Sequence, residues 1–153
     1  MLPIPTRFKM VTGFGESNAK LNAFDNALLN AGIGNLNILR VSSILPPNCA
    51  LDPSLIIPAG SLVPTAYGSI TSTEKGEMIA AAVSVGISSQ ELFGVIMEYS
   101  GKCAKKDAEE EVKKMVEAAF KQRDLPLSKV LVKGIEYRVK KIGSVIAAVS
   151  LWY

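Results

Sequence analysis

Apolar positions recur with a helical period between residues 104 and 123. One face of this stretch carries small and apolar side chains: Ala104, Ala108, Val112, Met115, Ala119 and Phe120. The opposite face carries acidic and basic residues four positions apart: Glu109–Lys113, Glu110–Lys114 and Glu117–Lys121. This pattern is typical of an amphipathic helix that packs one face on a core and pairs charges on the other. We therefore predict a helix over residues 104–123.

A shorter helix and seven strands follow from the remaining apolar positions. Residues 20–32 place Leu21, Phe24, Leu28 and Leu29 at helical spacing before Gly32, a residue type that commonly ends helices. Alternating or continuous apolar runs predict strands over 8–12, 35–45, 61–73, 77–88, 91–101, 129–141 and 144–153. Residues 46–60, with four prolines, form the only long irregular segment.

The order of these elements favours an α/β fold with largely antiparallel sheets, because the links between consecutive strands are short. Several strands, such as "MIAAAVSV" and "VIAAVSLW", are apolar on both faces. Both faces of such strands have to be covered by helices, by another sheet or by another subunit. The length of 153 residues suits a single domain over 1–153.

Composition removes several classes of chemistry. The chain contains no histidine, which excludes Ser-His-Asp and Cys-His nucleophile systems and imidazole metal sites. Cys49 and Cys103 are the only thiols, too few for a structural zinc, and we expect no metal. An enzyme built on this chain has to work with serine, acidic residues, asparagine, lysine or tyrosine, or with a cofactor.

Charge and hydropathy exclude two kinds of partner. The net charge of +3 arises after residue 100, but the lysines there alternate with glutamates and lack an aromatic platform. We therefore expect no nucleic-acid partner. The longest apolar runs reach about half of the ~20 residues that a membrane span requires, and the first ten residues lack the signal-peptide pattern. We expect a cytoplasmic protein with no membrane partner.

The stretch "RVSSILPP", residues 40–47, contains two adjacent serines, Ser42 and Ser43, inside an apolar run. A serine hydroxyl can attack the carbonyl carbon of the preceding residue and convert the amide into an ester. This shift is uphill in a relaxed peptide, so a fold has to strain the bond or stabilise the oxyanion. Elimination from the ester and release of ammonia would leave a pyruvoyl group. Ser-Ser pairs are common, and a half-exposed strand that ends in a loop also explains these residues.

Longer stretches around the serine pair match a known family. The segments "LNAFDNALLNAGIGNLNILRVSSILPP", "PAGSLVPTAYG", "GVIMEYSGKC" and "AAVSLWY" resemble pyruvoyl-dependent arginine decarboxylases, from about Phe8 to Tyr153. The resemblance implies an αββα four-layer sandwich of mainly antiparallel sheets with outer helices. It also implies self-cleavage between Ser42 and Ser43 into chains 1–42 and 43–153, with a covalent pyruvoyl cofactor derived from Ser43.

The activity implied by the resemblance is decarboxylation of L-arginine to agmatine and CO2, through a Schiff base between the pyruvoyl carbonyl and the substrate amine. The implied partner is a second and third copy of the chain, in a homotrimer of processed protomers with active sites between subunits. Two alternatives stay open: the same chemistry on histidine or ornithine, and a non-catalytic oligomeric subunit that is never cleaved. The physiological role implied by such an activity is polyamine synthesis or acid resistance, and the sequence does not choose between the two.

Two residues match catalytic positions of the family. Glu98, in "VIMEY", matches the proton donor, and its apolar neighbours favour a raised carboxyl pKa, although an outward-facing strand residue fits the alternation too. Asn37 matches an active-site asparagine. In a straight strand at ~3.3 Å per residue, Asn37 lies about 20 Å from Ser43. Either the strand bends sharply or Asn37 contributes to the active site of a neighbouring subunit, and we favour the second explanation. Alternatively, Asn37 has only a structural role, in the strand ladder or as a capping residue.

Two residues of the first helix match the substrate-binding positions. Asp25 falls four residues after Leu21 and three before Leu28, on or beside the apolar stripe, where a carboxylate is costly unless it is paired. Its structural partner would be Arg40 or a lysine. The resemblance implies instead that Asp25 receives the guanidinium of arginine and that Leu21 lines the same pocket.

Overall fold

The computed structural model describes all residues 1–153 and contains two sheets and two helices. The five-stranded sheet has the order β2-β5-β9-β1-β4, and the four-stranded sheet has the order β3-β7-β6-β8. The strands of the first sheet are β1 (Arg7–Ser17), β2 (Asn37–Arg40), β4 (Ala50–Leu51), β5 (Leu62–Ser72) and β9 (Ile142–Trp152). Those of the second are β3 (Ile44–Leu45), β6 (Met78–Ile87), β7 (Gly94–Gly101) and β8 (Lys129–Arg138). The helices are α1 (Lys20–Asn30) and α2 (Lys105–Gln122).

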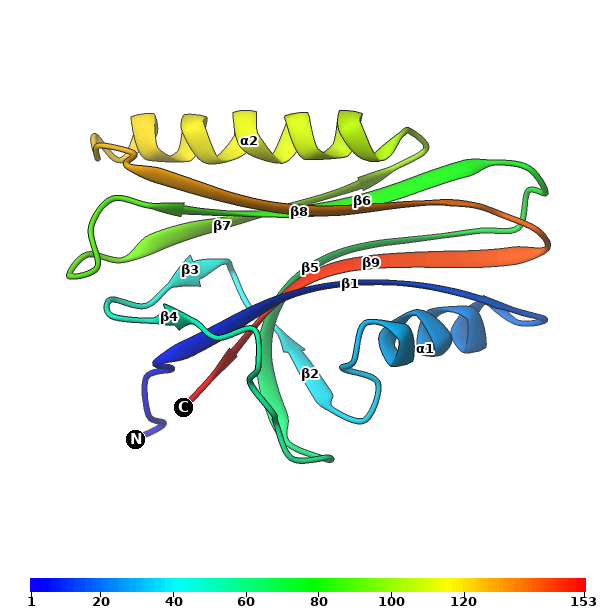
Figure 1. The fold of residues 1–153 in the computed structure, drawn as a ribbon, viewed down its shortest axis with the longest axis horizontal. Coiled ribbons are helices and arrows are strands. Elements are labelled where there is room, and N and C mark those ends of the chain that lie inside the picture. The colour runs from blue at the N-terminus through cyan, green and yellow to red at the C-terminus, as the bar shows by residue number, and fades with distance from the viewer.

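The elements stack in four layers, with α1 and α2 on the outside and the two sheets face to face between them (Figure 1). Helix α1 packs on β1 and β9, and α2 packs on β6, β7 and β8. Most strand pairs are antiparallel, and only β1–β4 and β2–β5 run parallel. The expected αββα sandwich of mainly antiparallel sheets is therefore confirmed.

The two central strands explain the doubly apolar sequences. Strand β9 lies in the middle of its sheet, and β6 lies inside the other, so each has a helix on one face and the opposite sheet on the other. The main core lies between the sheets and includes Phe8, Val83, Ile96 and Val149. Both faces of these strands are buried, as parallel-sheet strands usually are, although here the pairing is antiparallel.

Helix α1 lies very close to β1 because two glycines of the strand face it. A Cβ atom at Gly13 would lie 2.2 Å from the carbonyl oxygen of Ala27, and one at Gly15 would lie 2.4 Å from that of Ala23. No side chain larger than hydrogen fits at either position. The glycines therefore decide which face of α1 turns inward, namely the face that carries Ala23 and Ala27, which are both buried.

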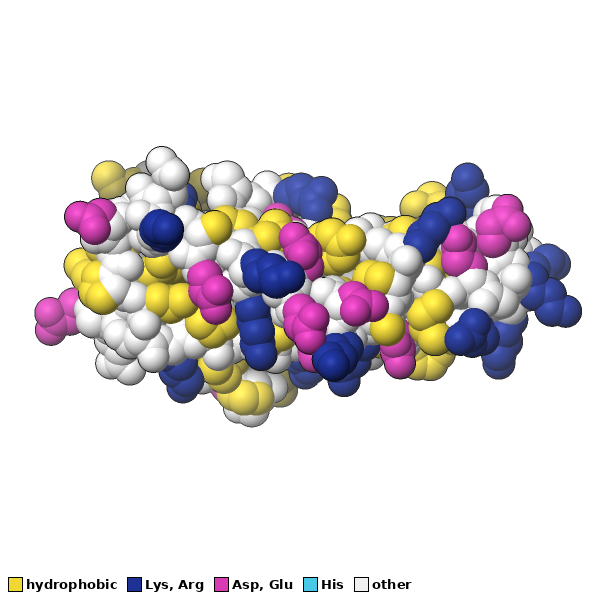
Figure 2. All heavy atoms as spheres, turned by 90° about the horizontal axis from the view of Figure 1, so that it is seen from above, with side chains coloured by type: hydrophobic (Ala, Val, Ile, Leu, Met, Phe, Trp, Pro, Cys, Tyr) yellow, Lys and Arg dark blue, Asp and Glu magenta, His cyan; other side chains and the backbone are white.

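Two details of α2 differ from the sequence prediction. Its buried face includes Val116, while Ala104 precedes the helix as its N-cap residue. The ion pairs along the helix join Lys105 to Glu109 at 3.9 Å and Lys106 to Glu110 at 4.0 Å. The expected pairs, with glutamate preceding lysine, are not formed. The outer face of α2 carries both signs of charge, as expected (Figure 2).

The most consequential difference concerns the strand predicted over residues 35–45. This segment forms two short strands in different sheets, because β2 pairs with β5 in one sheet and β3 pairs with β7 in the other. Residues 41–43 cross from one sheet to the other between them. The serine pair therefore lies in a crossover, not within a strand.

Neither helix is both long enough and apolar enough to cross a membrane.

Candidate active site

The crossover is held at both ends by backbone hydrogen bonds to opposite sheets. On one side, the amide of Val41 donates to the carbonyl of Thr65 in β5 at 3.3 Å. On the other side, the carbonyl of Ser43 accepts from the amide of Ile96 in β7 at 2.8 Å. The peptide bond between Ser42 and Ser43 thus lies between two fixed points on two different sheets.

Ser43 has a left-handed backbone conformation with φ of 73°. This conformation costs a residue with a side chain roughly 1–2 kcal/mol relative to ordinary conformations. Strained backbone of this kind concentrates at functional sites, where the surrounding structure maintains it. Here the flanking strands β2 and β3 maintain it, because each is paired to its own sheet.

The side chain of Ser43 points at a carboxylate. Its Oγ lies 3.1 Å from Oε1 and 3.0 Å from Oε2 of Glu98, and it donates its hydroxyl hydrogen to this carboxylate. Ser43 is buried, with 8% of its surface exposed. The sequence spacing alone does not predict this contact, because Ser43 lies in the crossover between β2 and β3, whereas Glu98 lies in β7, far along the chain.

Glu98 faces the layer between the sheets. It lies opposite Val83 in the β6–β7 pairing and shares its strand face with Ile96, and both residues belong to the inter-sheet core. Glu98 is therefore not the outward-facing strand residue that alternation also allowed. Burial raises the pKa of the Glu98 carboxyl above its usual value, while the Ser43 hydrogen bond and the charge of Arg40 oppose this shift.

Ser43 and Glu98 open into a cavity of about 280 Å³ at the edge of the four-stranded sheet. Strand β3 is two residues long, so most of β7 has no partner on this side and the cavity occupies the vacant edge. Its lining is mainly apolar and includes Met97 and Met115 from β7 and α2. Two arginines complete it, Arg40 from the end of β2 and Arg123 from the end of α2.

Arg40 is fixed by an aromatic residue of β5. Its guanidinium lies 4.3 Å from the centre of the Tyr67 ring and also donates a hydrogen bond to the Tyr67 carbonyl. Such stacking holds an arginine side chain in one orientation. The positive charge is therefore fixed near Glu98, where it favours the ionised carboxylate.

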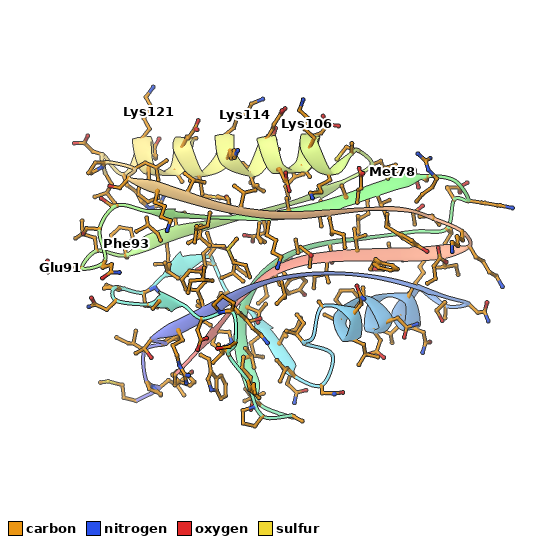
Figure 3. The ribbon with its side chains drawn as sticks, in the orientation of Figure 1. Met78, Glu91, Phe93, Lys106, Lys114 and Lys121 are labelled. Carbon is orange, nitrogen blue, oxygen red and sulfur yellow. The ribbon has the colours of Figure 1, made fainter.

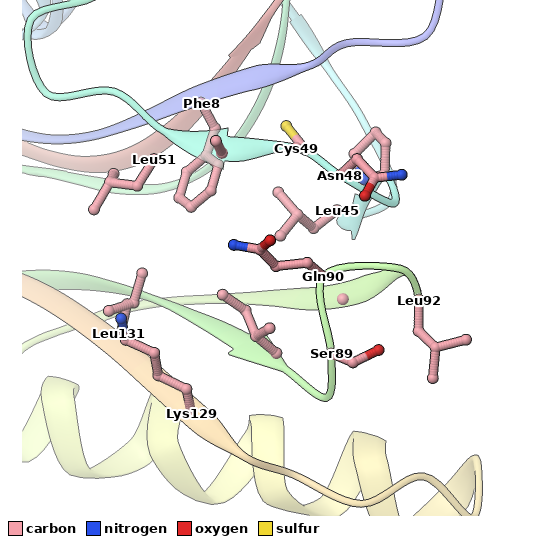
Figure 4. A pocket seen from close by; sticks show the side chains of 14 residues that line it. Phe8, Leu45, Asn48, Cys49, Leu51, Ser89, Gln90, Leu92, Lys129 and Leu131 are labelled. Atoms are coloured by element: carbon pink, nitrogen blue, oxygen red, sulfur yellow. The ribbon is translucent and has the colours of Figure 1, made fainter.

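A second cavity, of about 270 Å³, lies on the other side of β3 (Figure 4). It is lined by Phe8, Leu45 and Leu131, with the side chains of Gln90 and Cys49 among them. Burial raises the pKa of the Cys49 thiol to about 11, so this sulfur stays protonated and is a poor nucleophile near neutral pH. This cavity therefore lacks an evident acid–base pair.

The remaining predicted site residues lie elsewhere in the protomer. The side-chain amide of Asn37 donates to the carbonyl of Gly60 at 2.9 Å, and Asn37 does not line the Ser43 cavity. Leu21 is 76% exposed, and Asp25 is also exposed on the outer face of α1. Within one chain, only Ser42, Ser43 and Glu98 of the predicted set come together.

Asp25 lies beside the apolar positions Leu21 and Leu29, as expected, but this face of α1 is exposed and the carboxylate needs no partner within the protomer. The glycines of β1 draw Ala23 and Ala27 inward, which turns Asp25 to the surface. Asp25 forms no ion pair in the protomer, with Arg40 or with any lysine. Arg123 also lines the cavity, which no sequence pattern predicted, because its position depends on how the end of α2 packs over β7.

Comparison with known proteins identifies the family of the chain. Residues 7–153 match the family model described as pyruvoyl-dependent arginine decarboxylase (PvlArgDC). A protein of Methanocaldococcus jannaschii named pyruvoyl-dependent arginine decarboxylase is 48% identical over 98% of this chain and 92% of its own length. Proteins of the same name from Pyrococcus abyssi and Thermococcus kodakarensis are each 44% identical over 97% of this chain and 96% of their own lengths. The chain therefore belongs to the pyruvoyl-dependent arginine decarboxylase family.

Proposed function

We propose that this chain, acting as a single domain, cleaves itself between Ser42 and Ser43 and then decarboxylates L-arginine to agmatine and CO2. The observation that carries the proposal is the hydrogen bond from the Ser43 hydroxyl to Glu98, made at a strained crossover that opens into a cavity. Family membership names the substrate and the type of cofactor.

Cleavage begins when Oγ of Ser43 attacks the carbonyl carbon of Ser42. The amide C–N bond breaks and an ester forms, while the hydroxyl proton passes to the freed nitrogen of residue 43. Loss of the Cα proton of residue 43 then expels Ser42 as a carboxylate that keeps the former Oγ. The resulting dehydroalanine tautomerises to an imine, and one water molecule hydrolyses it to the pyruvoyl group and ammonia. No external oxidant or reductant is needed.

Two features of the uncleaved chain fit the first step. The left-handed conformation raises the energy of the reactant at residue 43, and the Glu98 carboxylate orients the attacking oxygen through its hydrogen bond. Val41 and Ser43 remain bonded to opposite sheets, so the bond cannot relax by shifting either strand.

The same residues fit a pyruvoyl group at position 43. Such a group supplies a ketone carbonyl that takes up the substrate amine and accepts the electron pair released with CO2. Position 43 is buried beside Glu98 and next to the cavity, as substrate access and proton transfer require. The raised pKa of Glu98 keeps its carboxyl protonated to a higher pH than usual. Glu98 therefore delivers the proton to the carbon that loses CO2.

The remaining site residues come from a neighbouring copy of the chain in a homotrimer. Asn37, Asp25 and Leu21 lie outside the Ser43 cavity of their own protomer. The side chains of Leu21 and Leu29 flank Asp25 on the exposed face of α1 and are 76% and 50% exposed. An apolar surface around one carboxylate suits a site that is completed by a second subunit and receives a guanidinium.

Intact-mass analysis and CO2 release test the proposal together. The purified chain should give two fragments that meet between residues 42 and 43, the second lighter by one ammonia than simple hydrolysis predicts. Ser43→Ala should stay uncleaved and inactive while its fold is unchanged. Cleavage with faster CO2 release from histidine or ornithine would move the substrate assignment to that amino acid. A single uncleaved wild-type chain that releases no CO2 would refute the proposal in favour of a non-catalytic subunit.

Mixed oligomers test the contribution of Asn37. Asn37→Ala and Ser43→Ala chains should each remain uncleaved when they are expressed alone. Co-expression should restore cleavage of the Asn37→Ala chain, because its Ser43 then meets the intact Asn37 of the other variant. If co-expression leaves both chains uncleaved, Asn37 does not act on a neighbouring subunit.

A further inference from the structure

Two arginines line the Ser43 cavity, but only one is engaged by other side chains. Arg40 is held against the Tyr67 ring and carbonyl. Arg123 makes one hydrogen bond, from Nη1 to the Ala119 carbonyl of its own helix at 3.1 Å, and no ion pair. Its other N–H groups therefore remain available to a ligand with acceptor oxygens.

The charge balance of the cavity favours an anionic group in the ligand. Arg40 and Arg123 are its only basic side chains, and Glu98, with its raised pKa, is its only acidic one. The other lining residues are apolar or hydroxyl-bearing. A cation that enters this space is repelled by both guanidinium groups, whereas a carboxylate finds a guanidinium with free donors.

We propose that Arg123 binds the α-carboxylate of the substrate and thereby decides which end of the arginine molecule enters the cavity. This inference rests on the proposed function. Arginine carries a cationic group at each end, but only the end with the reacting amine also carries a carboxylate. Repulsion by Arg40 and Arg123 disfavours entry of the guanidinium, and attraction by Arg123 draws in the carboxylate.

The same charges also prepare the amine for reaction. An α-ammonium next to two guanidinium groups in an apolar cavity loses its proton more readily than in water. Only the neutral amine carries the lone pair that attacks a carbonyl carbon. Arg40 and Arg123 therefore favour the reactive form of the substrate as well as its orientation.

The kinetic consequence is specific to this role. The carboxylate loses its charge as CO2 forms, so its bond to Arg123 is strongest before the reaction and weakens in the transition state. An interaction of this kind tightens binding but does not speed the chemical step. Removing it should raise KM for arginine and leave kcat unchanged or higher.

The experiment compares two ligands that differ by the carboxylate. In processed Arg123→Gln enzyme, KM for arginine should rise about 10- to 100-fold, the range of a lost charge-assisted hydrogen bond. The inhibition constant of agmatine, which lacks the carboxylate, should stay within about threefold of wild type or fall, because repulsion is relieved. Arg123→Lys, which keeps the charge but not the fork of donors, should show an intermediate KM.

Lys121→Gln is the matched control. It removes one positive charge from the same end of α2, but Lys121 does not line the cavity and extends away from the sheets (Figure 3). Its KM, kcat and agmatine inhibition should equal those of wild type.

Three results would overturn the inference. An unchanged KM for arginine in Arg123→Gln would show that Arg123 does not bind the carboxylate. If Arg123→Gln weakens the binding of arginine and of agmatine equally, Arg123 maintains the shape of the site and does not bind the carboxylate. Loss of self-cleavage in both Arg123→Gln and Arg123→Lys would assign it to processing, for example as the counter-ion of the new carboxylate at Ser42. Wild-type enzyme that is cleaved but releases no CO2 from arginine would instead refute the proposed function.

Discussion

The left-handed conformation of Ser43 leads to a quantitative prediction about the scissile bond. Ser43→Gly and Ser43→Ala both remove the hydroxyl, so neither variant can cleave itself and both lose the hydrogen bond to Glu98. The two variants differ in the conformational cost of φ of 73° at residue 43, which is roughly 1–2 kcal/mol for alanine and almost zero for glycine. Glycine also makes the unfolded chain more flexible, which lowers the free energy of unfolding by roughly 0.5–1 kcal/mol. The glycine variant should therefore be more stable by about 1 kcal/mol.

Urea unfolding of the two uncleaved variants at equal protein concentration measures this difference. With a slope of roughly 2 kcal/mol/M, the midpoint of Ser43→Gly should lie about 0.5 M above that of Ser43→Ala. Ser42, which has no positive φ, is the matched control. In the Ser43→Ala background, Ser42→Gly should be less stable than Ser42→Ala. If Ser43→Gly is instead less stable than Ser43→Ala by roughly 0.5–1 kcal/mol, which is the cost of the flexible glycine alone, the crossover holds no backbone strain and our account of the bond is wrong.

The remaining predictions concern the acid, the packing of α1 and the cleaved product. Glu98→Gln should still be cleaved but should decarboxylate about 10²–10⁴-fold more slowly. In the wild-type enzyme, activity should fall as pH rises through the raised pKa of Glu98, because only the protonated carboxyl donates a proton. Gly15→Ala should lower the free energy of unfolding by roughly 1–3 kcal/mol, since its Cβ would lie 2.4 Å from the backbone oxygen of Ala23. Gly134→Ala, whose Cβ would meet the flexible Glu109 side chain first, should cost less, and thermal melts of both variants measure the difference. Chains 1–42 and 43–153 should co-elute after cleavage in native buffer; separate elution would contradict the pairing described below.

The strain at Ser43 accounts for only part of the chemistry proposed for it. A destabilisation of 1–2 kcal/mol corresponds to a rate factor of roughly 5–30. Self-cleavage of a peptide bond needs far more, so orientation of Oγ and stabilisation of the oxyanion have to supply the rest. Glu98 provides the orientation within the protomer. No side-chain amide of the same chain lines the cavity, which agrees with a contribution of Asn37 from another subunit.

The sequence predicted those parts of the fold that depend on local patterns. The period of 3.6 residues identified α2, and continuous apolar runs identified β6 and β9 as strands covered on both faces. It did not predict the division of residues 35–45 between two sheets. Both halves are apolar and extended, and the change of sheet depends on pairing with β5 and β7, which are distant in sequence.

In the site, too, sequence motifs predicted some residues, whereas the positions of others depend on elements that are distant in sequence. Family motifs predicted Ser42, Ser43 and Glu98 as site residues, and the structure places all three at one cavity. The exposure of Asp25 and its apolar neighbours was not predicted, because the face that α1 buries is set by Gly13 and Gly15 of another element. Arg123 was missed because it reaches the cavity only through the packing of the end of α2.

The position of the serine pair between the sheets allows the chain to be cut without losing its fold. The segment before the bond keeps β1, which pairs with β9 along its whole length, and β2, which pairs with β5. The segment after the bond begins with β3 on β7 and keeps the hydrogen bond from Ile96 to the carbonyl of residue 43. A cut within β1 or β9 would instead interrupt a continuous ladder. The bond between Ser42 and Ser43 can thus be lost while each new chain end stays anchored to its own sheet. The two ends then lie on either side of Glu98.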